Sequence, residues 1–125
     1  MFGIIRYSTN FCWLECEKDL GRMYRRLFLR SYGLKLEAPS NGEHITVVGY
    51  GEKDKISQAW KSMEGKTLEF NLCTQLWWNY NALWLEVRSF DIEDLRTMLG
   101  LSNPMNPPLH FCIGYIGANN ADKMV

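Results

Sequence analysis

Hydrophobic and polar residues alternate along several short segments of this 125-residue chain, and such alternation predicts β-strands. The clearest case is 82–89, where aliphatic side chains occupy positions 83, 85 and 87 and larger or charged ones lie between them. Other segments are rich in β-branched and aromatic residues, which favour strands. The predicted strands are 2–7, 11–16, 44–48, 66–73, 82–89 and 109–116.

Apolar side chains spaced by three and four residues predict helices elsewhere in the chain. The clearest helix spans 17–32, with acidic residues early and arginines late, as the helix dipole favours. Gly33 is its natural end. A second helix is predicted at 53–63 and a third at 91–99. The segments between these elements are rich in turn-forming residues, and loops are predicted at 38–42, 77–81 and 103–108.

These elements predict a single α+β domain over residues 1–125, with the last few residues as a frayed tail. Five tryptophans, six tyrosines and six phenylalanines can bury enough area to form one core without a metal or disulfide. The two halves have related patterns, since in each a histidine begins a strand that follows a helix and a turn-rich loop. The sequence identity between the halves is too low to claim a repeat.

The formal net charge is +0, which disfavours a protein that coats long duplex nucleic acid but is compatible with a short anionic ligand. Four arginines are concentrated on the first predicted helix, where we expect them to form a solvated face. They are Arg22, Arg25, Arg26 and Arg30.

No apolar stretch is long enough to cross a bilayer, and the N-terminus lacks the pattern of a signal peptide. We therefore expect a cytoplasmic protein, in the host cytosol if it is viral, with no membrane partner. The four cysteines are irregularly spaced and contain no C-x-x-C pair, so reduced thiols are expected rather than a zinc ribbon. They are Cys12, Cys16, Cys73 and Cys112.

The chain contains two histidines, His44 and His110, and each begins a predicted strand. Residues i and i+2 of a strand share a face, so Thr46 projects with His44 and Cys112 with His110. Cleavage of a phosphodiester needs a base for the attacking hydroxyl or water and an acid for the departing oxygen, and histidine serves in both roles near neutral pH. Thr46 can donate a hydrogen bond to a non-bridging phosphate oxygen. If the two strands lie side by side or are related by a pseudo-twofold axis, both imidazoles converge on one phosphate from opposite directions.

Two tetrapeptides carry a family resemblance: His44-Ile45-Thr46-Val47 and His110-Phe111-Cys112-Ile113. They resemble the paired H-x-[S/T]-h motifs, where h is apolar, of the two-histidine phosphoesterase superfamily. This superfamily includes RNA 2′-5′ ligase-like proteins, cyclic phosphodiesterases and small phage nucleases that destroy cyclic oligonucleotide alarm signals. The order of elements, the motif separation and the strand at 82–87 are also similar to the family, so the resemblance covers nearly the whole chain.

The resemblance implies a bilobal fold, with two β-sheet lobes flanked by helices and both motif strands facing a central cleft. It implies no required metal or other cofactor, and one histidine acting as base with the other as acid. The preferred substrate is a cyclic oligonucleotide signal, because the chain is as compact as the phage members. The departure is Cys112, where the family usually has Thr or Ser, and a thiol is the weaker hydrogen-bond donor.

Several aromatic residues are candidates for binding a nucleobase by stacking. Trp77, Trp78 and Tyr80 lie together in a polar segment, and Tyr50 and Tyr115 follow the two histidines by six and five positions. Packing in the core is the competing interpretation of all five side chains.

Other interpretations of the same residues stay open at this stage. His44, His110 and Cys112 could bind zinc, although no fourth ligand is suggested by spacing. Cys112 and His110 could form a nucleophile pair, although neighbours at i and i+2 seldom have the geometry for proton abstraction. Hydrolysis of a 2′,3′-cyclic phosphate or of 2′-5′ linked RNA is the alternative reaction. A protein that binds a nucleotide or RNA without cleaving it is the alternative function, and Cys112 favours it.

Overall fold

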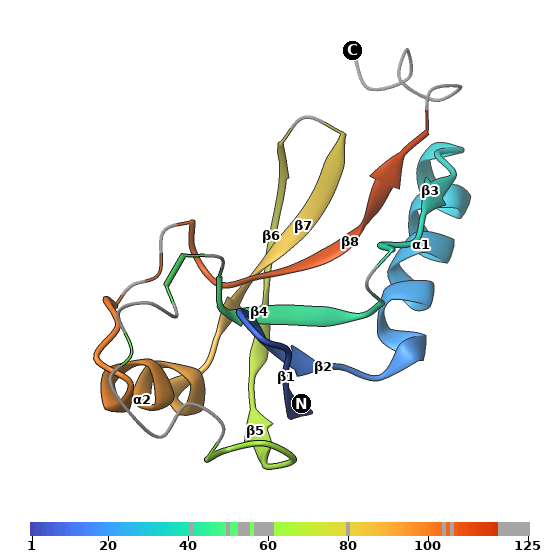
Figure 1. Ribbon diagram of the computed structural model, residues 1–125. Helices are drawn as coiled ribbons and strands as arrows, with labels where there is room; N and C mark the ends of the chain where they lie inside the picture. The colour runs from blue at the N-terminus through green and yellow to red at the C-terminus, as the bar shows by residue number, and fades with distance from the viewer. Residues whose placement is uncertain are drawn as a thin grey trace.

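In the part of the chain that the structure describes, the strands lie antiparallel in one sheet that curls into a half-barrel, accompanied by two helices (Figure 1). The structure is a computed structural model, and it describes residues 1–40, 42–49, 51–52, 56, 62–79, 81–103, 105 and 107–117. In chain order the elements are β1 (Phe2–Tyr7), β2 (Cys12–Glu15), α1 (Lys18–Tyr32), β3 (Leu36–Glu37), β4 (His44–Val48), β5 (Thr67–Glu69), β6 (Asn71–Asn79), β7 (Ala82–Arg88), α2 (Phe90–Met98) and β8 (His110–Ile116).

The order of strands across the sheet is β5-β1-β2-β4-β8-β7-β6, and β3 pairs separately with β8. Read outward from the central pair, β4-β2-β1 of the first half therefore matches β8-β7-β6 of the second half, and β5 lies beyond β1 at one edge. The halves meet where β4 and β8 pair, through Ile45 and Phe111. A local twofold relation between β4 and β8 thus organises the fold, and the two predicted sheets are joined into a single one.

The sheet has one buried and one open face, because burial alternates along its central strands. In β4 and β8 the buried positions include Ile45, Val47, Phe111 and Ile113, each with no exposed surface. Apolar side chains of both helices join these residues in one core. Helix α1 packs against β8 and β3, whereas α2 packs against β5 and β4, so each helix contacts the central strand of the other half.

A partly buried arginine ties α1 to β8. The Arg25 guanidinium donates one hydrogen bond to the backbone oxygen of Ile113 at 2.8 Å and another to Glu43 Oε1 at 2.9 Å. Gly21 lies one helical turn earlier, where a Cβ would collide with the Glu43 carboxylate. The absence of a side chain at Gly21 therefore lets this carboxylate lie against the helix.

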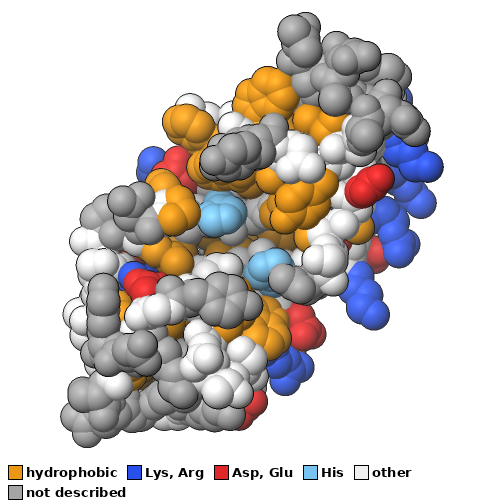
Figure 2. All heavy atoms as spheres, turned by 45° about the horizontal axis from the view of Figure 1, so that its top comes forward, with side chains coloured by type: hydrophobic (Ala, Val, Ile, Leu, Met, Phe, Trp, Pro, Cys, Tyr) orange, Lys and Arg blue, Asp and Glu red, His pale blue; other side chains and the backbone are white. Residues whose placement is uncertain are grey.

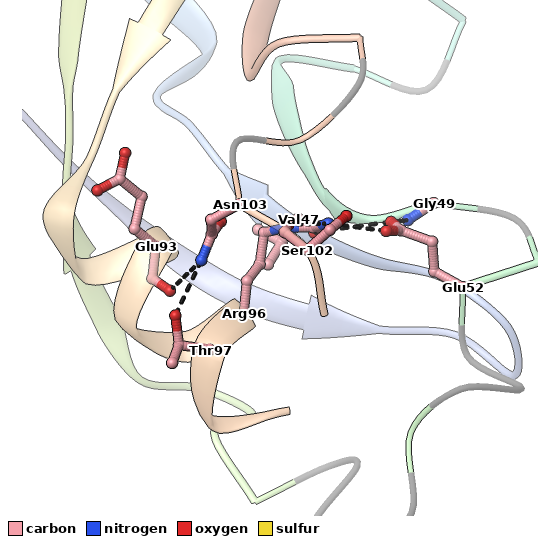
Figure 3. Close-up of polar contacts among 8 residues, drawn as sticks. All are labelled: Val47, Gly49, Glu52, Glu93, Arg96, Thr97, Ser102 and Asn103. Carbon is pink, nitrogen blue, oxygen red and sulfur yellow. Dashed lines mark hydrogen bonds and ion pairs between the residues drawn. The ribbon is translucent and has the colours of Figure 1, made fainter. Parts of the chain in front are cut away.

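A second arginine, Arg96 of α2, ties that helix to β4 and is completely buried (Figure 3). Its guanidinium donates to the backbone oxygen of Val47 at 2.7 Å and to that of Ser102 at 2.8 Å. It also binds both carboxylate oxygens of Glu52, at 3.0 and 2.7 Å. Val47 and Ile113 each stand three residues after a histidine, so the two arginines hold equivalent points of the two motif strands.

Most of the predicted elements are confirmed, and both described helices end or begin as the sequence indicates. Helix α1 ends at Gly33, which has a φ of 64° and donates its backbone N–H to Leu29. Helix α2 begins at Phe90, one residue before the predicted start, because the Ser89 hydroxyl caps it by accepting from the Ile92 N–H. Neither helix of the described residues is long and apolar enough to span a membrane.

Four further predictions differ from the structure or lie beyond it. The strand predicted at 66–73 is divided at Phe70 into β5 and β6, which lie at opposite ends of the strand order. The loop predicted at 77–81 is wrong for its first three residues, which extend β6, since Trp77 and Trp78 pair with Trp84 and Leu83. The solvated face predicted for the arginines of α1 is wrong at Arg25, which is paired with Glu43. Of the helix predicted at 53–63, only residues 56, 62 and 63 are described, and the last two form a turn; the rest lies outside the described residues.

Candidate active site

The two histidines lie on neighbouring strands and on the same face of the sheet. His44 begins β4 and His110 begins β8, and the antiparallel pair Ile45–Phe111 fixes the register between these strands. In this register Thr46 stands opposite His110, and His44 stands opposite Cys112. Directly opposite residues share a face, so all four predicted catalytic side chains form one cluster.

The geometry of this cluster leaves space for a group between the imidazoles. Residues at diagonal positions of an antiparallel pair have Cα atoms about 7–8 Å apart, and His44 and His110 are such a pair. All four side chains are half-buried, neither packed into the core nor fully exposed. Figure 2 shows both histidines on one face of the molecule, with hydrophobic side chains around them.

Each imidazole is held by the backbone two residues before it. His44 Nδ1 lies 2.9 Å from the Gly42 oxygen, and His110 Nδ1 lies 2.8 Å from the Pro108 oxygen. A carbonyl oxygen only accepts hydrogen bonds, so Nδ1 carries the proton in both contacts. This fixes the tautomer and leaves Nε2 of each ring as the atom that can take up or release a proton.

A glutamate stands beside each histidine on the same face. Glu15 of β2 pairs with His44, and Glu86 of β7 pairs with His110. Glu15 also forms an ion pair with Arg6, at 3.5 Å. The two glutamates thus occupy equivalent positions beside the two histidines in both halves of the sheet.

Cys112 has an unexpected partner, because β8 contains a bulge. The register against β7 moves from Leu83–Gly114 to Trp84–Cys112, so one extra residue of β8 turns Tyr115 onto the histidine face. The Tyr115 side chain lies next to the Cys112 thiol, which donates a weak hydrogen bond to the Gly114 oxygen at 3.9 Å. Burial raises the pKa of Cys112, and the charge of a Cys112 thiolate, followed by burial, raises the pKa of Tyr115. Both groups are therefore neutral near pH 7, a state in which the thiol is a poor nucleophile and a poor metal ligand.

Aromatic rings flank the cluster on both sides. Trp84 lies beside His110, with ring centroids 5.1 Å apart, and stacks on Trp77 at 5.6 Å with an interplanar angle of 13°. On the other side, Phe11 lies 6.4 Å from the His44 ring and 5.6 Å from that of Trp13.

The five predicted substrate-binding residues do not all reach this face. Trp77 lies on it through its pairing with Trp84, and the bulge brings Tyr115 to it. Trp78 points to the opposite face, because successive residues of a strand alternate. Tyr50 and Tyr80 lie outside the described residues.

Sequence reasoning missed Trp13 and Trp84 as site residues, although a signal for them was present. The tripeptide Trp-Leu-Glu occurs at 13–15 and again at 84–86, and in each half an arginine follows the glutamate by ten positions, at Arg25 and Arg96. These spaced identities lie at equivalent places in the two halves of the sheet. Aligning the halves on this tripeptide would have found the repeat and both tryptophans.

A cavity of about 560 Å³ lies next to His110 but includes neither histidine. Glu86, Pro108 and Leu109 are among its lining residues, and the charged side chains of the rest are three further acidic residues and one arginine. Such a lining disfavours an anionic ligand. Among the described residues, no group of three or more His, Cys, Asp and Glu side chains is placed to hold a metal ion.

Comparisons with models of protein families, with curated proteins and with solved structures found no match to this chain.

Proposed function

We propose that this protein is a metal-independent phosphodiesterase that cleaves a nucleotide or short oligonucleotide, with a cyclic oligonucleotide signal as preferred substrate. The observation that carries the proposal is the pair of imidazoles on adjacent strands, each with Nδ1–H bound to a carbonyl and Nε2 left for chemistry. The resemblance of the two motifs to those of the two-histidine phosphoesterases supports the same function, and we propose that the two halves of the sheet correspond to the lobes of that bilobal fold.

The proposed mechanism divides the proton transfers between the two Nε2 atoms. One neutral imidazole takes the proton from the attacking hydroxyl or water, and the other, protonated, gives its proton to the departing oxygen. The diagonal placement of His44 and His110 puts the two groups on opposite sides of a phosphate, as in-line displacement requires. The Thr46 hydroxyl donates to a non-bridging oxygen as charge develops there.

On the other side of the phosphate, the family's hydroxyl is replaced by the Cys112 thiol. The Tyr115 hydroxyl lies beside this sulfur and is the stronger donor of the two. We propose that Tyr115 supplies the hydrogen bond that Thr or Ser supplies in the family. The weak donor at Cys112 is then compatible with catalysis.

The second candidate function is a protein of this fold that binds a nucleotide or RNA without cleaving it. Cys112 favours this candidate, because the thiol weakens one half of the phosphate site. The two candidates differ in one measurable property, which is turnover of a ligand that binds. The same-class alternative, cleavage of a 2′,3′-cyclic phosphate or a 2′-5′ linkage, differs in the substrate that is turned over.

The test is to incubate the protein with cyclic di- and trinucleotides, 2′-5′ oligoadenylate and 2′,3′-cyclic nucleotides, with and without a chelator. We expect turnover in chelator and a bell-shaped pH profile, because one histidine must be neutral and the other protonated. Replacing either histidine by Ala should lower the rate by about 10²- to 10⁴-fold. The double variant should lose far less than the product of the single losses, because the two groups act as a unit.

Matched controls are His44→Asn and His110→Asn, in which the amide nitrogen takes the place of Nδ1 and can still donate to the carbonyl but cannot transfer a proton. They should fold like the wild type and lose as much activity as the Ala variants. Turnover that is lost in chelator and restored by zinc would reject metal independence. Tight binding without turnover of any member of the panel would favour the binding protein instead.

A further inference from the structure

Two aromatic walls flank the phosphate position, one in each half of the sheet. The Trp13 wall consists of Phe11 and Trp13, and the Trp84 wall consists of Trp77 and Trp84. Both walls lie on the histidine face, whereas the two described helices pack against the other face with the core. Packing against these helices therefore does not account for the aromatic side chains.

The walls occupy equivalent positions in the two halves. Trp13 of β2 pairs with Thr46 of β4, and Trp84 of β7 pairs with Cys112 of β8. Each tryptophan is thus one strand outward from one of the two phosphate-binding positions, on opposite sides of the histidine pair. Their placement follows the same local twofold that relates His44 to His110.

We infer that the site takes a phosphodiester with a nucleobase on each side of the phosphate, with one base stacked on each wall. This inference rests on the proposed function and specifies its substrate as a two-base unit of a linear or cyclic oligonucleotide. Every nucleobase has a π-face, so an indole ring can hold any base in this way.

The separation of the walls decides the conformation of this unit. Strands β2 and β7 are three strand spacings apart, or about 14 Å along the sheet. Bases stacked on each other in a duplex strand lie about 3.4 Å apart. The two bases must therefore be splayed apart around the phosphate, as in single-stranded ligands bound to aromatic side chains. A 2′,3′-cyclic mononucleotide fills only one wall, and a duplex cannot offer its bases to either.

The test compares ligands that differ in the second base but carry the same diester charge. Isothermal titration of the His44→Asn/His110→Asn variant, whose turnover should be at least about 10²-fold slower, uses the 3′-5′ and 2′-5′ forms of ApA and the methyl ester of AMP. The second base should tighten binding by about 5- to 150-fold for at least one linkage. Trp13→Leu and Trp84→Leu should each abolish most of this advantage, whereas Trp13→Phe and Trp84→Phe should retain much of it.

The strand itself offers a matched control, since Trp77 and Trp78 are adjacent but point to opposite faces. Trp77→Leu should weaken ApA binding, and Trp78→Leu should leave it unchanged. Equal affinity for ApA and the AMP ester would overturn the inference. In variants that fold and melt like the parent, so would a Trp13→Leu protein that keeps the advantage of the second base, or a Trp78→Leu protein that loses it.

The outcomes separate this inference from the proposed function. Binding that depends on both walls, in a protein that cleaves none of the substrate panel, rejects the phosphodiesterase and keeps the two-base site. Turnover of ApA and of a one-base diester at equal kcat/KM keeps the phosphodiesterase and rejects the two-base site.

Discussion

Arg96→Met removes the most deeply buried charge of the described structure. The Arg96 side chain is 0% exposed, and the change takes away hydrogen bonds to the Val47 and Ser102 oxygens and the two contacts with Glu52. Methionine keeps an apolar side chain of comparable reach, so the variant tests the guanidinium rather than the packing of its stem.

The magnitude follows from the groups left without a partner. Breaking a buried ion pair by removing one member costs about 3–5 kcal/mol. The Glu52 side chain is 21% exposed, so water relieves part of this cost. Two backbone oxygens also lose a donor, and each one that water cannot reach destabilises the fold by about 1–3 kcal/mol. We expect Arg96→Met to lower the free energy of unfolding by about 4 kcal/mol.

Arg25→Met is the comparison variant at the equivalent position of α1. Its side chain is 16% exposed and loses one backbone oxygen and one carboxylate contact, so we expect a smaller loss of about 2–3 kcal/mol. Urea unfolding at neutral pH, with the m-value checked for constancy, measures both variants. Adding Glu52→Gln to Arg96→Met should recover part of the loss, because the carboxylate charge that Arg96 neutralised is then removed as well.

The reasoning is refuted if Arg96→Met stays within about 1 kcal/mol of the wild type, which is small against the cost of an unpaired buried charge. It is also refuted if Arg25→Met is the more damaging of the two. Either result would mean that the buried hydrogen bonds do not fix the motif strands.

Burial raises the pKa of Cys12 and of Cys16 from 9.0 to about 12, so the folded state keeps protons that the unfolded state releases between these values. The contribution of the two thiols to the free energy of unfolding should be fully present below pH 9 and should fall as the pH rises toward 12, by about 1.4 kcal/mol per pH unit for each thiol. Thermal melts at pH 8 and 10.5 test this, and equal midpoints would contradict it. Cys112→Ser should keep or raise turnover, because a hydroxyl is the better donor, and abolished activity would reveal a chemical role of the thiol. Tyr115→Phe should lower kcat more than it changes substrate affinity in the Cys112 protein and less in Cys112→Ser; equal effects in both would disprove that Tyr115 replaces the missing hydroxyl. Thr46→Ala should likewise lower kcat more than binding, and a change in binding alone would argue against transition-state stabilisation.

Elements with strong local patterns were predictable. The alternation at 82–89 became β7, and the spacing of apolar residues at 17–32 became α1 with Gly33 as its end. The prediction failed at 77–79 because Trp77 and Trp78 stand in a polar stretch without apolar alternation. Pairing with β7 extends this segment as an edge strand, which shows that a tertiary contact can override a weak local pattern.

The sequence by itself determined which side chains share a strand face, because that geometry repeats every two residues of one segment. His44 with Thr46, and His110 with Cys112, are of this kind. Only the tertiary structure decided that β4 and β8 are neighbours in a register that sets Thr46 opposite His110. That register depends on pairing between residues 66 positions apart, which no local pattern encodes.

The same distinction applies to the surroundings of the histidines. The carbonyls that orient the two imidazoles come from loops. The bulge that turns Tyr115 onto the histidine face arises where β8 pairs with β7. Strand pairing also brings the Trp13 wall and the Trp84 wall to the site. Local sequence supplied the reactive groups. Long-range hydrogen bonding between strands decided their relative positions, because the identity and register of neighbouring strands are set by the packing of the whole core.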